Sequence, residues 1–231
     1  MTDSHGKIEN LLFDLDGTLT DPRIGITASV LYALKKMGVP APPAEELLWC
    51  IGPPLHNSFL KLLGDRKKVD EAVQHYRERY IAIGMYENQI YHGIHDVLAA
   101  LKHSGCTLHV ATSKLKSIAD KIIDHFEFRP YFTNVYGSEV DGTRGDKGDL
   151  IAFILKQEDA DVSSYVMIGD REHDMIGARK NQIRGIGVGW GYGTAVKLTE
   201  SGAETVLFHP NELLECLTYP TLIHGTRRAG L

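Results

Sequence analysis

The sequence predicts an α/β protein: a doubly wound (Rossmann-like), mostly parallel sheet with a small all-helical domain inserted after its first strand. Two observations predict the sheet. A continuous apolar run ends at residue 13, and strand-like and helix-like segments alternate from residue 94 to residue 217, a pattern typical of βα units in a parallel sheet. A third observation predicts the insert, because the apolar positions of residues 22–89 show only helical spacing.

The first strand is predicted over residues 8–14, where the apolar side chains form a buried-strand pattern. The helices of the insert are predicted over residues 24–37, 45–50, 55–63 and 66–83. Gly38 supplies a stop for the first of them. We therefore expect residues 21–87 to form a helical cap domain, and residues 1–20 and 88–231 to form the α/β core domain.

Strands and helices alternate in the rest of the chain. The helices are predicted over residues 94–103, 115–126, 148–157, 173–181, 195–201 and 211–217. The strands are predicted over residues 106–111, 134–137, 165–168, 185–189 and 205–208. Residues 224–231 show no periodicity and are expected to be irregular. Ligands bind at the carboxyl ends of the strands in such sheets, so residues that follow the strands are the first candidates for a site.

Composition narrows the class of protein. Its 231 residues are 43% hydrophobic and 24% charged, which is ordinary for a globular enzyme. The net charge of −5 leaves no basic excess for a phosphate backbone, so we expect no nucleic-acid partner. The three cysteines form no CxxC pair, which indicates neither a zinc knuckle nor a disulfide framework and fits a reducing compartment. With no signal region or membrane-length apolar run, we expect a cytoplasmic protein without a membrane partner.

Asp14 and Asp16 follow the first strand directly. Residues two apart in a strand lie on the same side, about 6.6 Å apart. Two such carboxylates repel each other and resist burial, so a compensating cation is expected. A turn alone would explain Asp16 and Gly17 but not the second acid. Glycosidase acid pairs come from separate elements, so the spacing favours phosphoryl transfer through a carboxylate nucleophile.

Residues 13–19, Phe-Asp-Leu-Asp-Gly-Thr-Leu, resemble the first motif of the haloacid dehalogenase (HAD) superfamily in its phosphatase form. The resemblance implies that Asp14 attacks phosphorus to form an aspartyl-phosphate. It also implies that Asp16 protonates the leaving oxygen and then activates water, and that Gly17 lies at the substrate phosphate. The dehalogenase branch lacks the second acid, and P-type ATPases carry Lys at the position of Leu15, so a phosphatase is favoured.

Thr112 and Ser113 follow the strand predicted over residues 106–111. The Thr112 hydroxyl and the backbone N–H groups after it, at a helix start, suit a phosphate oxygen. A simple N-cap is the better explanation of Thr112 when it is taken alone. Ser113 stands where many relatives carry Asn, which leaves the role of its side chain open.

Lys147 stands just before an apolar helical run. A cation in the first turn of a helix opposes the macrodipole, which favours a role in neutralising the substrate phosphate and Asp14. Lys114, near the Thr112 turn, remains a competitor, whereas Lys121 is expected at the surface. The resemblance favours Lys147, because the third motif of the superfamily falls there.

Asp170 and Asp174 open a helix and share one face of it. Hard oxygen ligands suit Mg²⁺. The resemblance implies Asp170 as a direct ligand, together with Asp14 and the backbone carbonyl of Asp16, and Asp174 as a supporting carboxylate. His173 leaves a zinc site as the alternative, although no cysteine stands nearby.

The glycines of residues 185–193 recur at every second position. A dinucleotide fingerprint has the spacing GxGxxG and opens a helix. The observed spacing instead predicts a crowded strand end and a loop close to the site. Trp190 and Tyr192 are interpreted as packing residues.

The predicted helical insert stands where the phosphoglycolate phosphatase-like group of the superfamily carries its cap. A cap excludes water and contacts the leaving group. Arg23, Gly52 and His56 are the residues of the insert expected to reach the substrate, although turns between helices explain them equally well.

The motifs together are similar to the HAD 5′-nucleotidase branch, close to the phosphoglycolate phosphatases. His92-Gly93 departs from the Pro-Gly that is common at that turn. The resemblance implies a Mg²⁺-dependent phosphatase that acts on a small-molecule phosphomonoester. A nucleoside 5′-monophosphate is the substrate expected first. Phosphoglycolate hydrolysis and a β-phosphoglucomutase-like phosphotransfer are the alternatives. A non-catalytic regulator that keeps the fold for binding alone is disfavoured, because the four core residues of the motifs are all present: Asp14, Asp16, Lys147 and Asp170. The choice between monomer and homodimer stays open.

Overall fold

Six parallel strands form the central sheet in the order β5-β4-β1-β6-β7-β8. The strands are β1 (Asn10–Phe13), β4 (Thr107–Leu115), β5 (Asn134–Ser138), β6 (Tyr165–Gly169), β7 (Arg184–Val188) and β8 (Thr205–Leu207). This computed structural model describes residues 8–159 and 161–218; the tail at 224–231, expected to be irregular, lies outside them. The sheet order reverses around β1, as in a doubly wound fold, so the predicted fold class is confirmed.

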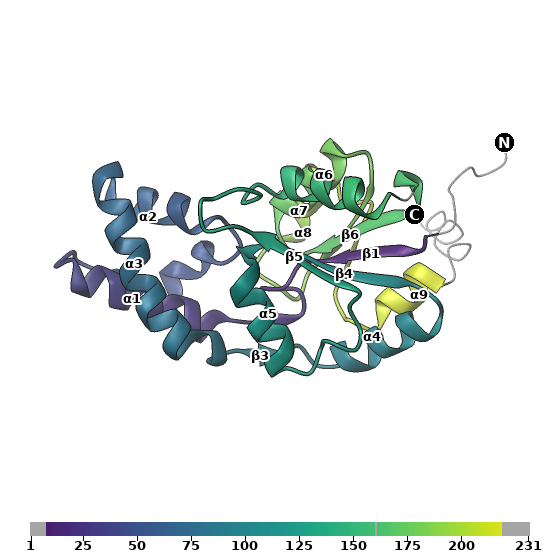
Figure 1. Ribbon diagram of the computed structural model, residues 1–231, viewed down its shortest axis with the longest axis horizontal. Helices are drawn as coiled ribbons and strands as arrows, with labels where there is room; N and C mark the ends of the chain where they lie inside the picture. The colour runs from purple at the N-terminus through teal and green to yellow at the C-terminus, as the bar shows by residue number, and fades with distance from the viewer. Residues whose placement is uncertain (1–7, 160, 219–231) are drawn as a thin grey trace, which may run out of the picture.

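Helices cover both faces of the sheet (Figure 1). The helices of the core are α4 (Ile94–His103), α5 (Lys116–His125), α6 (Lys147–Glu158), α7 (Glu172–Lys180), α8 (Ala195–Ser201) and α9 (Glu212–Thr218). Alternate side chains of β1 face opposite layers. Leu11 and Phe13 join the core under α4, α5 and α9, whereas Leu12 joins the core under α6 and α7. Strands buried on both faces explain the unbroken apolar run of β1.

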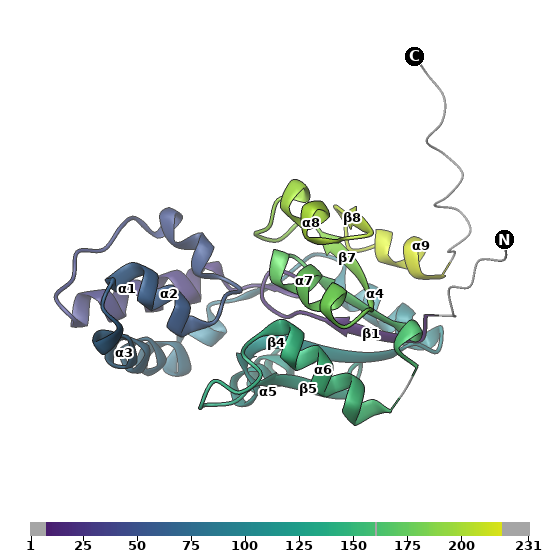
Figure 2. The same cartoon turned by 90° about the horizontal axis from the view of Figure 1, so that it is seen from above.

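A second group of helices lies apart from the sheet, at one end of the molecule (Figure 2). It consists of α1 (Arg23–Lys36), α2 (Leu55–Leu63) and α3 (Val69–Ala82), with short 3₁₀ turns η1 (Ala44–Cys50), η2 (Arg66–Lys68) and η3 (Gly84–Tyr86). We call this part the helical insert (residues 23–86). Its core includes an aromatic stack in which Tyr76 lies 5.1 Å from Tyr80, ring centre to ring centre. Burying each such large side chain contributes about 1.5–3 kcal/mol.

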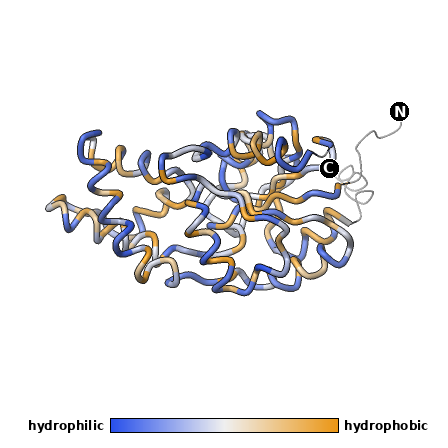
Figure 3. The backbone as a smooth tube through the Cα atoms, in the orientation of Figure 1, coloured by the Kyte–Doolittle hydropathy of each residue, from blue (hydrophilic) through white to orange (hydrophobic). Residues whose placement is uncertain are grey.

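Apolar segments run through the strands in the middle of the core, and hydrophilic segments lie along the outer turns and helices (Figure 3). This distribution follows from the burial of β1 and β6, whose side chains are almost all excluded from solvent. Within the described residues, no helix is long and apolar enough to cross a bilayer.

Two short strands connect the helical insert to the core. β2 (Thr20–Asp21) and β3 (Gln89–Ile90) pair antiparallel, with Thr20 opposite Ile90. The sequence does not predict them, because two residues are too few to show alternation. The prediction of no strand over residues 22–89 is therefore wrong at residue 89.

The remaining element bounds agree with the predictions to within a few residues, with three corrections. Residues 44–50 form a 3₁₀ rather than an α-helix. The long helix predicted over residues 66–83 is split, because Asp65 caps a separate 3₁₀ turn before α3. The strand predicted to end at residue 111 continues as β4 to Leu115, with an irregularity between Ala111 and Leu115. The third correction changes the shape of the site.

Candidate active site

The carboxyl ends of β1, β4 and β6 meet at one edge of the sheet, and the polar residues singled out in the sequence gather there. All of the following are buried: Asp14, Asp16, Thr112, Lys147, Asp170 and Asp174. Because parallel strands present their carboxyl ends at a common edge, residues separated by up to 160 positions in the chain come into contact.

Lys147, the first residue of α6, lies between two carboxylates. Its Nζ is 3.1 Å from Asp14 Oδ1 and 2.7 Å from Asp174 Oδ1. The same ammonium donates a hydrogen bond of 2.8 Å to the carbonyl of Ala111. Burial alone would lower the pKa of Lys147, but Asp14 and Asp174 outweigh it and raise the pKa above its ordinary value. The lysine therefore remains charged inside the protein.

Asp14, Asp170 and Asp174 form a buried cluster whose ligand oxygens lie within 4.8 Å of one another. Burial raises the pKa of Asp170 well above its ordinary value, and the neighbouring Asp174 and Asp14 raise it further. Burial also raises the pKa of Asp174, against the opposing effect of Lys147. Lys147 is paired with Asp14 and Asp174, and no ion pair of Asp170 occurs among the described residues. The cluster therefore carries excess negative charge that a cation would compensate.

The donor set of this cluster fits Mg²⁺. It offers carboxylate oxygens only, the hard ligands that Mg²⁺ takes. Among the described residues, neither histidine nor cysteine belongs to it, which disfavours the zinc alternative. Asp170 is held in place by the backbone N–H of Tyr192, which donates to Oδ2 at 2.8 Å. The backbone N–H of Arg171 holds Asp174 in the same way at 3.0 Å.

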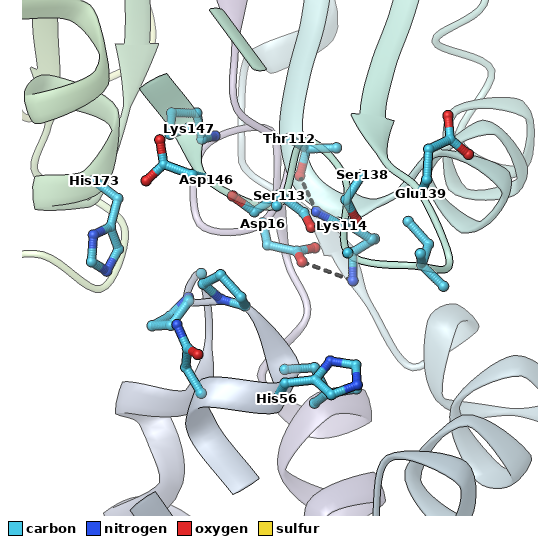
Figure 4. Close-up of a pocket in the computed structure, with 18 of the residues that line it drawn as sticks. Asp16, His56, Thr112, Ser113, Lys114, Ser138, Glu139, Asp146, Lys147 and His173 are labelled. Carbon is cyan, nitrogen blue, oxygen red and sulfur yellow. Dashed lines mark hydrogen bonds and ion pairs between the residues drawn. The ribbon is translucent and has the colours of Figure 1, made fainter. Parts of the chain in front are cut away.

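The carboxylate of Asp16 lies outside this cluster and has a lysine of its own (Figure 4). Nζ of Lys114 is 2.8 Å from Asp16 Oδ2. The other oxygen, Oδ1, is buried and has no hydrogen-bond partner among the described residues. Burial raises the pKa of Asp16, and Lys114 opposes part of that shift.

Lys114 and Lys147 are therefore not competitors for one position, because each lysine contacts a different carboxylate. The sequence contained a signal for Lys114. It stands two residues after Thr112, and residues two apart share one side of a strand. The signal depends on the continuation of β4 past residue 111, to Leu115.

Thr112 and Ser113 line the cavity, but neither caps a helix. α5 begins at Lys116 and has no side-chain cap. The hydroxyl of Thr112 instead accepts a hydrogen bond of 3.2 Å from the backbone N–H of Lys114. The N-cap interpretation of Thr112 is therefore wrong, because the irregular end of β4 occupies this part of the chain.

Gly17 has a left-handed backbone, with φ of 86°. A side chain there would collide with the carboxylate of Asp170, so only glycine lets the turn after β1 approach this residue. Gly17 is not among the residues that line the cavity. The structure thus gives Gly17 a packing role against Asp170.

The glycine-rich segment after β7 packs against the same site, as its spacing predicts. A side chain on Gly191 would collide with Asp170 and with the backbone of Gly17. Trp190 and Tyr192 do more than pack. The indole N–H of Trp190 donates to the carbonyl of Thr18 at 3.0 Å, and the Tyr192 hydroxyl donates to Asp21 in β2.

A cavity of about 830 Å³ lies between this edge of the sheet and the helical insert. Gly52 and His56 line it, and His56 lies across the cavity from Asp16 (Figure 4). Arg23 does not reach it. The Arg23 guanidinium is largely exposed and pairs with Asp21 at 3.1 Å.

Arg77 of α3, which the sequence did not indicate, also lines this cavity. Its Nε is buried without a hydrogen-bond partner among the described residues. No sequence pattern distinguishes Arg77 as a cavity residue, because a lysine or arginine in an amphipathic helix usually lies on the face exposed to solvent.

Known proteins match this chain along most of its length. A sequence model of the haloacid dehalogenase-like hydrolases matches residues 11–188. A 5′-nucleotidase from Pseudomonas aeruginosa is 47% identical over 199 residues, which cover 86% of this chain and 90% of that protein. Tyrosine-protein kinase PtkA from Mycobacterium tuberculosis is 39% identical over 210 residues, 90% of this chain and 72% of PtkA.

Solved structures also resemble this fold. The crystal structure of a predicted phosphatase from Clostridium acetobutylicum matches with a TM-score of 0.89 and 38% identity. The match covers 92% of this chain and 99% of that one. The likeness therefore includes both the sheet and the helical insert.

Proposed function

Since the chain belongs to the haloacid dehalogenase-like hydrolase family, we propose that it is a Mg²⁺-dependent phosphatase that hydrolyses nucleoside 5′-monophosphates through an aspartyl-phosphate. The observation that carries this proposal is the buried Lys147, held between Asp14 and Asp174 beside an excess of carboxylates. We further propose that residues 21–87 act as a cap domain, and residues 1–20 with 88–231 as the core domain.

Asp14 is the proposed nucleophile. Its carboxylate attacks the phosphorus of the substrate, and the bond from phosphorus to the ester oxygen breaks. Lys147, whose ammonium lies 3.1 Å from the Asp14 carboxylate, neutralises charge on the phosphoryl group. Thr112 and Ser113, at the irregular end of β4, are proposed to hold the phosphate oxygens through the Thr112 hydroxyl and backbone N–H groups.

Asp16 is the proposed acid and base. It gives its proton to the leaving ester oxygen, which departs as an alcohol. The resulting carboxylate then takes a proton from a water molecule that attacks the aspartyl-phosphate. Phosphate is released and the Asp14 carboxylate is restored. The raised pKa of Asp16 supports the first of these roles, because burial favours the protonated form.

Mg²⁺ would be held by Asp14, Asp170 and the backbone carbonyl of Asp16, with Asp174 as the supporting carboxylate. When bound, the ion supplies positive charge that stabilises the phosphoryl oxygens in the transition state. Asp170 and Asp174 are fixed for this task by the backbone of Tyr192 and Arg171.

The substrate class is supported by the relative named 5′-nucleotidase and by the size of the cavity. Its volume of about 830 Å³ lies within the range of pockets that enclose small molecules, about 300–1,000 Å³. His56 and Gly52 of the helical insert line the side of the cavity where the nucleoside would lie.

Phosphoglycolate is the second candidate substrate, and Arg77 is the observation that favours it. A guanidinium that lines the cavity and whose Nε has no partner in the part of the chain that the structure describes suits the carboxylate of such a substrate. The relative named as a tyrosine kinase keeps a phosphotransferase, such as a β-phosphoglucomutase-like enzyme, among the alternatives.

A substrate screen tests the proposal. The Mg²⁺-loaded protein is given nucleoside 5′-monophosphates, phosphoglycolate and sugar phosphates, and both phosphate release and phosphate transfer are measured. We expect sustained release from nucleoside 5′-monophosphates. Asp14→Asn should abolish it in a folded protein, whereas the exposed Asp124→Asn should not. Transfer to a second sugar phosphate without net release would instead support the phosphotransferase.

A further inference from the structure

Lys114 connects the helical insert to Asp16. Its Nζ is 2.8 Å from Asp16 Oδ2 on one side and donates a hydrogen bond of 2.7 Å to the hydroxyl of Tyr80 on the other. Asp16 belongs to the core, whereas Tyr80 belongs to α3 of the helical insert. An ammonium has three N–H donors, so both contacts are made at once. The mechanism proposed above leaves this lysine without a role.

We propose that Lys114 is a positioning residue for Asp16, and that Tyr80 makes this positioning depend on where the helical insert lies. The inference rests on the proposed function, in which Asp16 is the acid and base. Lys114 does not touch the reacting atoms. It acts by fixing the direction in which the Asp16 carboxylate points.

The two oxygens of Asp16 are in different surroundings, and this asymmetry supports the proposal. Oδ2 is held by Lys114, whereas Oδ1 is buried with no partner among the described residues. A buried oxygen without a partner is costly, so it points to a group that arrives later. The leaving oxygen of the substrate, and then the attacking water, are such groups. Lys114 thus holds one oxygen and keeps the other free for proton transfer.

Tyr80 holds Lys114 in two ways. Besides the hydrogen bond to the hydroxyl, the ammonium lies 4.5 Å from the centre of the Tyr80 ring, within the range of a cation–π contact. Tyr80 is almost fully buried, and its ring stacks on Tyr76 inside the insert. Its position is therefore set by the packing of the insert. Any movement of the insert away from the sheet would remove both contacts from Lys114.

A purely structural ion pair is the competing explanation, because a buried lysine beside a buried carboxylate also compensates charge. The two explanations predict different coupling between the effects of removing the Tyr80 hydroxyl and removing the Lys114 ammonium. If Lys114 only compensates charge, removing the Tyr80 hydroxyl and removing the ammonium should act independently. If Tyr80 acts through Lys114, its hydroxyl should no longer matter once the ammonium is absent.

A double-mutant cycle on the full chain with saturating Mg²⁺ tests this difference. Lys114→Met should lower kcat for a nucleoside 5′-monophosphate about 100-fold, the lower end of the effect of a general acid–base group, and leave KM within about threefold. Tyr80→Phe, which keeps the ring, should lower kcat about tenfold, the worth of one hydrogen bond. The double variant should equal Lys114→Met alone. Lys114→Arg, which restores the cation, should recover most of the loss.

The leaving group gives a second readout, because p-nitrophenolate departs readily without a proton. The pre-steady-state rate of phosphorylation of the enzyme is measured with p-nitrophenyl phosphate and with the nucleotide, in the wild type and in Lys114→Met. The factor by which Lys114→Met lowers the rate should be at least ten times smaller with p-nitrophenyl phosphate than with the nucleotide. Matched controls are Lys116→Met, an exposed lysine paired with Asp120, and Tyr32→Phe, an exposed contact of the insert with Glu78. Both should keep wild-type kcat. The inference would be overturned if the double variant lost kcat by the product of the two single losses. It would also be overturned if kcat of Lys114→Met stayed within twofold of the wild type.

Crystal structures of the wild type and Lys114→Met separate this inference from the proposed function. The Asp16 carboxylate should turn away from its wild-type direction when Lys114 is removed. An unmoved Asp16 would contradict the inference whether or not the protein is a phosphatase. A wild-type protein that releases no phosphate from any substrate, but whose Asp16 turns in the variant, would contradict the proposed function alone.

Discussion

Lys147 and Asp14 form an ion pair of 3.1 Å in which both side chains are almost fully buried. The pair joins the start of α6 to the end of β1, two elements separated by more than 100 residues. It places a permanent cation beside the proposed nucleophile and opposes the repulsion among the three carboxylates of the cluster.

Replacing Lys147 by Met should therefore affect both activity and stability. We expect kcat to fall at least 100-fold, because charge on the phosphoryl group is no longer neutralised. The free energy of unfolding should fall by about 3–5 kcal/mol, since Asp14 and Asp174 lose their partner. Urea denaturation and steady-state kinetics measure the two effects. Lys121→Met, at an exposed position of α5, should leave both unchanged.

Gly17→Ala should destabilise the protein and weaken Mg²⁺ binding, because the added methyl group would collide with the carboxylate of Asp170. Gly38 is a matched control, since it has φ of 67° and nothing within 4 Å of an added methyl group. Gly38→Ala should cost about 1 kcal/mol for its backbone alone. An equal loss in both variants, measured by urea denaturation, would show that the contact with Asp170 is unimportant.

Mg²⁺ should stabilise the folded protein even without substrate. Binding at a concentration of about 100 times Kd adds about 2.7 kcal/mol, which for a chain of this size raises Tm by about 5–10 °C. Asp170→Asn should remove most of this increase, whereas Asp70→Asn, at a side chain that is 93% exposed, should not. Thermal denaturation with and without a chelator provides the measurement. An unchanged increase in Asp170→Asn would place the ion elsewhere.

His109 should make the protein less stable in mild acid. It is fully buried in β4, neither ring nitrogen has a hydrogen-bond partner among the described residues, and burial lowers its pKa against a smaller opposing effect of Glu158. The unfolded chain, with a His pKa of about 6.5, therefore binds the proton more readily than the folded protein. Stability is retained above about pH 6.5 and is lost as the pH falls below it.

The free energy of unfolding, measured in urea between about pH 5 and pH 7.5, should fall more steeply in the wild type than in His109→Leu. The difference between the two curves isolates this histidine from the buried carboxylates, which titrate in both proteins. His103→Gln, at the exposed end of α4, should follow the wild type. Parallel curves for wild type and His109→Leu would show that His109 does not govern the acid response.

The fold was largely predictable from the sequence, because its periodic patterns are long and uninterrupted. The helices of residues 94–103 and 195–201 have the predicted bounds. The continuation of β4 was not predictable, since Thr112, Ser113 and Lys114 interrupt the apolar pattern that marks a buried strand. These three residues at the polar end of the strand line the cavity of the candidate site.

Asp14, Asp16 and Asp170 were predictable, because each follows a strand whose carboxyl end must lie at a common edge. Lys147 opens α6 instead, and a cation at a helix start together with the family resemblance predicted it.

The contributions of the helical insert were not predictable. Whether Arg23, His56 or Arg77 reaches the cavity depends on how the insert sits against the sheet, and no local pattern encodes that placement. Arg23 pairs with Asp21 outside the cavity, whereas Arg77 lines it.

The pairing of β2 with β3 brings the two ends of the helical insert side by side, with Thr20 opposite Ile90. A segment whose ends meet at one point can be exchanged for another without altering the path of the surrounding chain. A lineage of such proteins can therefore acquire new substrates by recombination within one short stretch of the gene, while the inherited chemistry of the sheet edge is retained. Chimeras joined at β2 and β3 offer the same route to engineered specificity.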